Sequence, residues 1–219
     1  MPKRLISSFG ILASILSVGI CQLSDEETRF AFEQCMVNNQ AEVCRMLIEN
    51  DIFVENIDEC DDESCGITGI LYAGAGYKNQ AIQYLKKAID LGQVNIYGVL
   101  ADVYMKLMDY VNAKKNYERC IELCSDKMAK AASLTFLAAI YEAGGNVAKK
   151  DLQKAIELYK NACDLDSPLA CYQLGLFYIE GVGVSPNLHS AKKYYGKSCD
   201  LGQELACIGY QNLIKQGVQ

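Results

Sequence analysis

A fourfold repeat in which a tyrosine precedes an alanine constrains the fold of this chain more than any other feature. The tyrosines are spaced 32, 37 and 37 residues apart, and each alanine follows its tyrosine after 9 to 14 residues. A period of this length is typical of solenoids built from helix hairpins. The four pairs are Tyr72/Ala81, Tyr104/Ala113, Tyr141/Ala155 and Tyr178/Ala191.

Each repeat is predicted to form two amphipathic helices joined by a turn. In the last full unit, Leu174, Gly175 and Tyr178 share one helix face. Gly181 and Gly183 follow, and they are expected to end that helix because glycine adopts the left-handed conformation at low cost. A single hairpin cannot bury its apolar face alone, so the units must stack. The predicted fold is therefore all-α, a right-handed α-solenoid of stacked helix hairpins with intra-repeat disulfides.

The same cysteine phrase marks two junctions between units. CDLDSPLAC runs from Cys163 to Cys171, and CDLGQELAC runs from Cys199 to Cys207. Each phrase joins the end of one helix to the first turns of the next, where antiparallel helices lie close together, so a disulfide is sterically reasonable. We expect each bridge to staple its turn and to stabilise it by about 2–3 kcal/mol.

Three further local cysteine pairs precede these two. The first two pairs are also expected to form bridges. The third has i,i+4 spacing, which is too wide for a disulfide in a regular helix. Its cysteines bridge only if the helix unwinds near Ser125; otherwise they are free thiols or reach another unit. The pairs are Cys35/Cys44, Cys60/Cys65 and Cys120/Cys124.

The N-terminus has the layout of a secretory signal peptide over residues 1–21. Lys3 and Arg4 precede an uncharged, mostly apolar segment, and acidic residues follow Gln22. An uncleaved membrane anchor and a lipid anchor at Cys21 are the alternatives. Cleavage removes two positive charges and no negative ones, so the net charge moves from −6 to −8. We expect an acidic protein, periplasmic or secreted, with no span after signal removal and no nucleic-acid partner.

The C-terminal repeats resemble the Sel-like repeat branch of the tetratricopeptide superfamily. The segment from Leu169 to Gly202 carries the alanine, Leu-Gly, tyrosine, Gly-x-Gly-Val, alanine and aromatic pair of that repeat. Cysteines eight residues apart are similar to those of the Helicobacter cysteine-rich protein family. The resemblance implies Sel-like repeats over 128–219, more generic tetratricopeptide repeats over 66–127, and an N-terminal helical cap with cysteine pairs over 22–65.

Some members of that cysteine-rich family are described as penicillin-binding or weakly β-lactam-hydrolysing, which gives an alternative function. The serine β-lactamase signature has three elements, and only Ser190 and Lys193 match one of them. His189 is the only histidine, and we interpret it as a loop residue rather than a catalytic base or a metal ligand. The acidic run from Asp58 to Glu63 lacks the glycine and spacing of a calcium loop. We therefore predict no catalytic residue, no metal and no cofactor.

The predicted mode of action is protein–protein binding. In stacked hairpins the first helix of each unit lines the concave side. By resemblance to tetratricopeptide grooves, six polar or aromatic positions are predicted to face a protein or peptide ligand there. These positions are Asn95, Asp102, Thr135, Glu142, Tyr172 and Asn212.

Overall fold

A computed structural model describes residues 30–31, 34–35, 40–49 and 56–218 of the chain. The described part is helical, and it contains no strand. The predicted signal peptide and lipidation site lie outside these residues. None of the described helices is long and apolar enough to cross a membrane. The chain divides into two compact units, Met1–Ala88 and Ile89–Gln219.

The first unit contains α3 (Ala41–Glu49), α4 (Asp62–Ala75) and most of α5 (Lys78–Asp90). Asp61 begins α4 with a capping box in which its carboxylate and the Ser64 side chain each accept the other's backbone N–H. Leu85 of α5 packs against Gly69 of α4, where a Cβ would lie 2.8 Å from the Leu85 side chain. The α4–α5 pair is thus a tightly packed helix hairpin.

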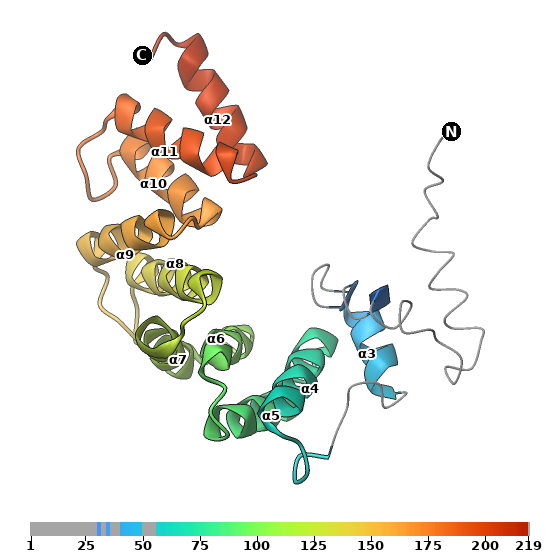
Figure 1. The fold of residues 1–219 in the computed structure, drawn as a ribbon. Helices are drawn as coiled ribbons and strands as arrows, with labels where there is room; N and C mark the ends of the chain where they lie inside the picture. The colour runs from blue at the N-terminus through green and yellow to red at the C-terminus, as the bar shows by residue number, and fades with distance from the viewer. Residues whose placement is uncertain (1–29, 32–33, 36–39, 50–55, 219) are drawn as a thin grey trace, which may run out of the picture. The chain divides into compact units, whose positions relative to one another are not determined.

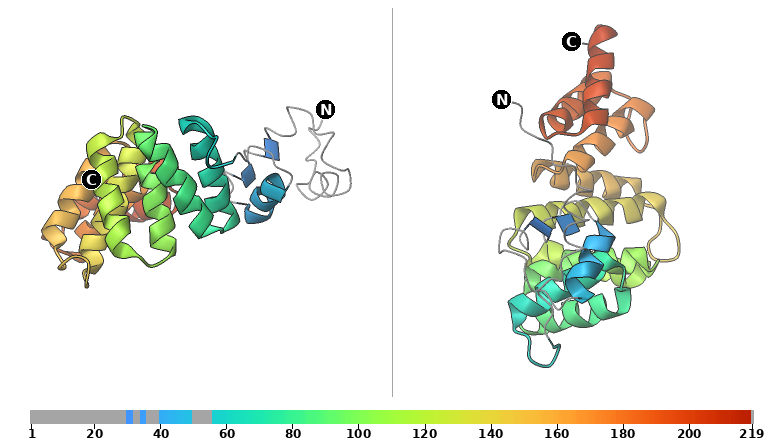
Figure 2. Two further views of the ribbon diagram at one scale, coloured as in Figure 1. Left: turned by 90° about the horizontal axis from the view of Figure 1, so that it is seen from below. Right: turned by 90° about the vertical axis from the view of Figure 1, so that its right-hand side faces the viewer.

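The second unit is a stack of helix hairpins (Figures 1 and 2). Its core is made by the repeat alanines of the second helices, which are fully buried and let each pair approach closely. The glycines that follow α8 and α10 have positive φ and end those helices. The elements are η2 (Val94–Ile96), α6 (Tyr97–Lys106), α7 (Tyr110–Leu123), α8 (Lys127–Ala143), α9 (Leu152–Asp164), α10 (Pro168–Glu180), α11 (Leu188–Asp200) and α12 (Glu204–Lys215).

All five local cysteine pairs, including Cys120/Cys124, lie at disulfide distance. The Cα–Cα separations run from 4.6 to 5.3 Å, within the normal range for a bridge. The condition set for Cys120 and Cys124 is met, because α7 ends at Leu123 and Cys124 has extended backbone. The prediction of an all-α solenoid with intra-repeat disulfides is confirmed.

The two expected N-terminal bridges are present, and both involve buried cysteines of the first unit. Cys44 and Cys65 are both 0% exposed, so they are core residues as well as bridge partners. The Cys35–Cys44 bridge lies in the apolar core of the first unit, and a Cβ on Gly74 of α4 would lie 2.7 Å from the Cys44 sulfur. Cys65, in the first turns of α4, bridges to Cys60 just before that helix. The Cys60–Cys65 bridge thus joins the start of α4 to the residues before it, and the Cys35–Cys44 bridge packs against α4 at Gly74.

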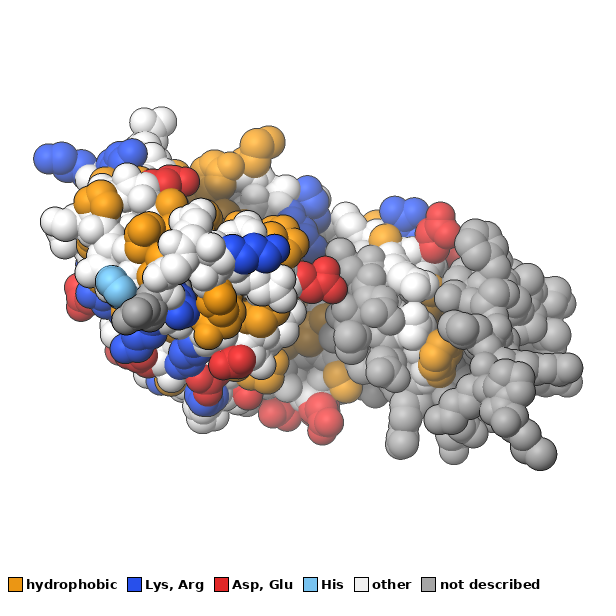
Figure 3. All heavy atoms as spheres, turned by 90° about the horizontal axis from the view of Figure 1, so that it is seen from above, with side chains coloured by type: hydrophobic (Ala, Val, Ile, Leu, Met, Phe, Trp, Pro, Cys, Tyr) orange, Lys and Arg blue, Asp and Glu red, His pale blue; other side chains and the backbone are white. Residues whose placement is uncertain are grey.

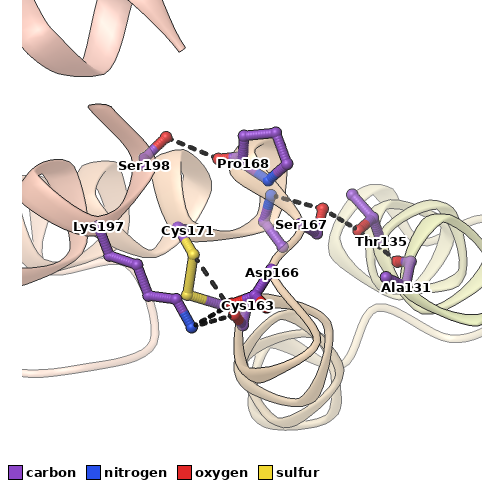
Figure 4. The surroundings of a disulfide bond; sticks show 10 residues. Ala131, Thr135, Cys163, Asp166, Ser167, Pro168, Cys171, Lys197 and Ser198 are labelled. Carbon is purple, nitrogen blue, oxygen red and sulfur yellow. Dashed lines mark hydrogen bonds and ion pairs between the residues drawn. A yellow bond between two sulfur atoms is a disulfide. The ribbon is translucent and has the colours of Figure 1, made fainter. Parts of the chain in front are cut away.

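The junction around the Cys163–Cys171 bridge joins two successive hairpins, α8–α9 and α10–α11 (Figure 4). The Asp166 carboxylate lies 2.6 Å from the Lys127 ammonium of α8 and 3.1 Å from the Lys197 ammonium of α11. Lys197 also donates to the Cys163 carbonyl at 2.6 Å. These paired cations lower the pKa of Asp166. The stapled turn is therefore held from both sides by neighbouring repeats.

Candidate partner-binding face

The first helices of the second unit present one continuous side of the stack. Figure 1 shows α6 and α8 on one side and α7 and α9 on the other. In the repeat frame Asp102 and Asn212 occupy the same position, Glu142 lies one turn later and Tyr172 one turn earlier. Positions spaced in this way share one face of a helix. We call this side, made by α6, α8, α10 and α12, the first-helix face.

Two carboxylates of this face are held by tyrosines of the second helices. The Tyr117 hydroxyl donates to Asp102 at 2.6 Å, and the Tyr159 hydroxyl donates to Glu142 at 2.8 Å. Burial raises the pKa of Asp102, and it also raises the pKa of both phenols well above 10. Each carboxylate is half-buried and fixed in direction. Asp102 and Glu142 are thus preorganised hydrogen-bond acceptors at the edge of the face.

Thr135 does not belong to the accessible face, which corrects the prediction for this residue. It is only 4% exposed. Its hydroxyl donates to the Ala131 carbonyl at 2.8 Å and shares a 2.9 Å hydrogen bond with Ser167 (Figure 4). The next hairpin packs over this position, so Thr135 joins two repeats instead of facing a ligand.

The other three predicted positions have different surroundings. Asn95 is exposed, and its Oδ1 accepts the backbone N–H groups of Ser125 and Asp126, which fastens the start of α8. Tyr172 is half-buried and stacks on Tyr195, with ring centroids 5.7 Å apart. Asn212 is exposed on α12. Tyr172 and Asn212 are therefore accessible to a partner, whereas Asn95 stabilises the start of α8.

A hollow of about 440 Å³ opens where α6, the start of α7, α8 and the α8–α9 loop meet. Met105 of α6 and Ala139 of α8 line it, and each lies three residues from one of the two carboxylates that the tyrosines hold. Its lining is mainly apolar. The lining residues are Met105, Tyr110, Ala139, Ile140, Ala143, Gly144, Gly145, Asn146 and Val147.

No pattern in the sequence pointed to this hollow. It forms because Gly144 lies against Lys150, where a Cβ on Gly144 would be 2.6 Å from the Lys150 Cβ. That close approach folds the α8–α9 loop beside α6. The tyrosines that hold the carboxylates could have been found in the sequence, because both lie four residues after the repeat alanine, as Tyr195 also does.

A second, shallower hollow lies between α11 and α12, near His189. Figure 3 shows His189 in pale blue with lysine side chains close to it. Lys192 donates to the Val218 carbonyl at 2.7 Å, and Lys197 is paired with Asp166. His189 lies in the first turn of α11, so its interpretation as a loop residue is wrong. The helix begins this early because Asn187, directly after Pro186, caps it. The nearby lysines thus already stabilise the fold.

The acidic run from Asp58 to Glu63 is an exposed helix start. Its Asp61 carboxylate accepts the Ser64 backbone N–H at 2.8 Å, which lowers the pKa of Asp61. Among the described residues there is no group of three or more histidine, cysteine or acidic side chains that could hold a metal ion.

Comparison with known protein families identifies the class of the fold. The tetratricopeptide repeat model matches residues 63–91 and 94–127, and the Sel1 repeat model matches residues 131–167 and 168–203. The chain is thus a protein of stacked helix-hairpin repeats. More particularly, it carries two tetratricopeptide repeats followed by two Sel1 repeats. Its predicted divisions after residues 21, 65 and 127 stay predictions.

Solved structures share this fold. A Sel1 repeat protein from Oxalobacter formigenes is 22% identical with a TM-score of 0.60, over 78% of this chain and 74% of that chain. A protective antigen of uropathogenic Escherichia coli strains with an SLR fold is 18% identical with a TM-score of 0.60. That match covers 88% of this chain but only 42% of the antigen.

A further structural match has a TM-score too low to indicate a common fold. Helicobacter pylori cysteine rich protein B is 22% identical over 92% of this chain and 96% of that chain, with a TM-score of 0.33. A search of curated protein sequences gives no match.

Proposed function

We propose that this protein is an exported, disulfide-stapled scaffold that binds a protein or peptide segment on its first-helix face. The observation that carries the proposal is the apolar hollow of about 440 Å³ between α6 and α8. A concave, mainly apolar site with a few oriented polar groups is the usual form of a binding pocket. Tyr110 and Asn146 supply polar groups in the lining. Asp102 and Glu142, which their tyrosine partners hold in place, each lie one helical turn from a lining residue of α6 or α8.

A half-buried tyrosine and an exposed asparagine further along the stack extend the binding surface. Tyr172 offers an aromatic ring and Asn212 offers an amide on later first helices. Side chains of these kinds recur in protein interfaces and in grooves for extended peptides. The acidic net charge of −6 disfavours nucleic acid as the ligand.

Export of the protein is supported by its cysteine chemistry. Disulfides persist in oxidising compartments and are rare in the cytosol. Ten cysteines lie in five bridges of the structure, and the basic and apolar order of residues 1–21 suits a signal peptide. N-terminal sequencing of the native protein should find a start near Gln22. An intact Met1 on the exported protein would contradict this.

Affinity capture from native envelope and culture supernatant tests the binding function. The Ala139→Arg variant places a long charged side chain in the hollow, so it should retain at least tenfold less partner than the wild type. Asn161→Arg introduces the same side chain on the exposed part of α9, and it should retain the partner normally. Equal capture by all three proteins would refute binding at the first-helix face.

A further inference from the structure

Met108 turns the chain between α6 and α7 in a conformation that suits glycine. Its φ is 59°, in the left-handed region that residues other than glycine, asparagine and aspartate rarely adopt. The residues that end the first helices of three other hairpins are all glycines with positive φ, Gly76, Gly144 and Gly181. Met108 therefore departs from the rule that its own repeats follow.

The fold does not compensate for this conformation with buried contacts. The Met108 side chain is 75% exposed. Asp166 is the one other described non-glycine residue with a positive φ. Aspartate tolerates this region, and Asp166 gains two ion pairs there, with Lys127 and Lys197. Within the described part of the fold, the Met108 side chain forms no comparable stabilising interaction. The choice of methionine for this backbone conformation therefore needs another explanation.

The turn that carries Met108 joins two residues that line the apolar hollow. Met105 precedes it and Tyr110 follows it. Leu107 and Val111, from the same turn, are 38% and 64% exposed. The hollow thus continues outward into an exposed apolar edge. Methionine suits such an edge because its flexible, polarisable side chain adapts to irregular partners.

Two exposed lysines, Lys149 and Lys150, follow the loop residues that line the hollow, and no ion pair among the described residues neutralises them. The acidic residues of the two loops, Asp109 and Asp151, cap α7 and α9 through the backbone N–H groups of Asn112 and Lys154. Their charge is turned toward helix N-termini, which favour it. Glu142, the nearest carboxylate of α8, accepts from Tyr159.

We propose that the hollow and its Met108 edge bind a protein segment in which bulky apolar side chains are flanked by acidic residues. The apolar side chains enter the hollow and cover Met108, and the acidic residues pair with Lys149 and Lys150. This inference rests on the proposed function and names the kind of partner segment that the first-helix face accepts.

Three labelled hexapeptides test the proposal by fluorescence anisotropy with the oxidised protein. The probe DELFDE has both features, KKLFKK reverses the flanking charge, and DEAADE lacks the apolar anchor. DELFDE should bind at least fivefold more tightly than either of the others. Equal binding of KKLFKK refutes the role of charge, and equal binding of DEAADE refutes the role of the hollow.

The variant Met108→Gly separates binding from strain. Glycine suits the backbone, so the variant should melt at a higher temperature than the wild type, while its affinity for DELFDE should fall about tenfold through loss of an apolar contact. Met128→Ala removes another exposed methionine, 81% exposed at the start of α8, and it should leave affinity unchanged. Unchanged affinity of Met108→Gly overturns the proposal.

A charge reversal gives a second and independent readout. The double variant Lys149→Glu/Lys150→Glu should bind DELFDE at least fivefold more weakly and should reverse the preference over KKLFKK. If this variant and Met108→Gly both bind DELFDE normally, whereas Ala139→Arg still loses its native partner in the capture experiment, the scaffold function stands and the inferred segment chemistry is wrong.

Discussion

Removal of the two C-terminal bridges, one at a time, measures what the disulfides contribute to this fold. Cys163–Cys171 and Cys199–Cys207 both have a sequence separation of 8. Loop-closure entropy therefore assigns them the same stabilisation, about 2.6 kcal/mol each. Their surroundings differ: Cys163 and Cys171 are 1% and 0% exposed, whereas Cys199 and Cys207 are half-buried.

The difference in burial predicts a difference in stability. Replacing Cys163 and Cys171 by alanine removes two buried groups, each worth about 0.8 kcal/mol by area. We expect Cys163→Ala/Cys171→Ala to lose about 4 kcal/mol of unfolding free energy. Cys199→Ala/Cys207→Ala should lose about 2.6–3 kcal/mol, because its sulfur atoms bury less surface. Urea unfolding followed by far-UV circular dichroism measures both losses, with helix content retained in each folded variant.

Hydrogen exchange shows where the stability is lost. Stacked repeats respond locally, so protection in Cys163→Ala/Cys171→Ala should fall first in α9 and α10 and last in α6 and α7. On full reduction it should fall first across 152–219 and later across 78–120. Equal losses in the two double variants would refute the burial argument. Unchanged protection together with lost partner binding would show that the cysteines serve binding rather than stability.

Three further substitutions or conditions test the packing and the titration of the repeats. Gly175→Ala places a Cβ 2.3 Å from the Tyr195 ring, and Gly209 packs against the opposite edge of that ring, so the ring cannot move away. The cost of overpacking should exceed the gain in helix propensity, and the variant should lose about 1–2 kcal/mol of unfolding free energy, measured by thermal melting. Burial raises the pKa of Asp102 above its unfolded value, so this group weakens the fold as pH rises through the folded-state pKa. Asp102→Asn still accepts from Tyr117 and does not titrate, so the wild type should lose stability relative to it as pH rises above about 4, the unfolded-state pKa of aspartate, and the opposite trend would contradict the assignment. Burial raises the pKa of Tyr195 to about 12, so its stabilisation should be complete below about pH 10 and lost as pH rises through 12, which absorbance of the phenolate can follow.

The stacked-hairpin fold followed from residues that act locally. The tyrosine and alanine recur in a fixed frame, glycines such as Gly181 end helices because of their own backbone freedom, and Cys163 and Cys171 are close in the chain. Each of these signals depends on a short segment, so it can be seen without the tertiary structure. The end of α7 before Cys124 was less certain, because helix boundaries depend on capping by later residues.

The predicted binding positions depended on more than helix periodicity. The resemblance to tetratricopeptide grooves placed Thr135 on the concave side together with positions such as Asp102 and Tyr172, but Thr135 is buried. Thr135 is buried because the next hairpin packs over it and brings Ser167 into contact with its hydroxyl. How much of a helix face the next hairpin covers depends on side chains far away in sequence. No local pattern reports that coverage.

An all-helical repeat fold with local disulfide bridges could be predicted from short segments, because repeat period, helix ends and loop-closing cysteines are short-range properties. The packed helices were needed to show that Cys44 and Cys65 belong to the core, that tyrosines of the second helices hold Asp102 and Glu142, and that a hollow opens beside α6 and α8. These features arise where helices from separate segments meet. Their geometry depends on the angle and distance between helices, which are set by the packing of many side chains together rather than by any one segment.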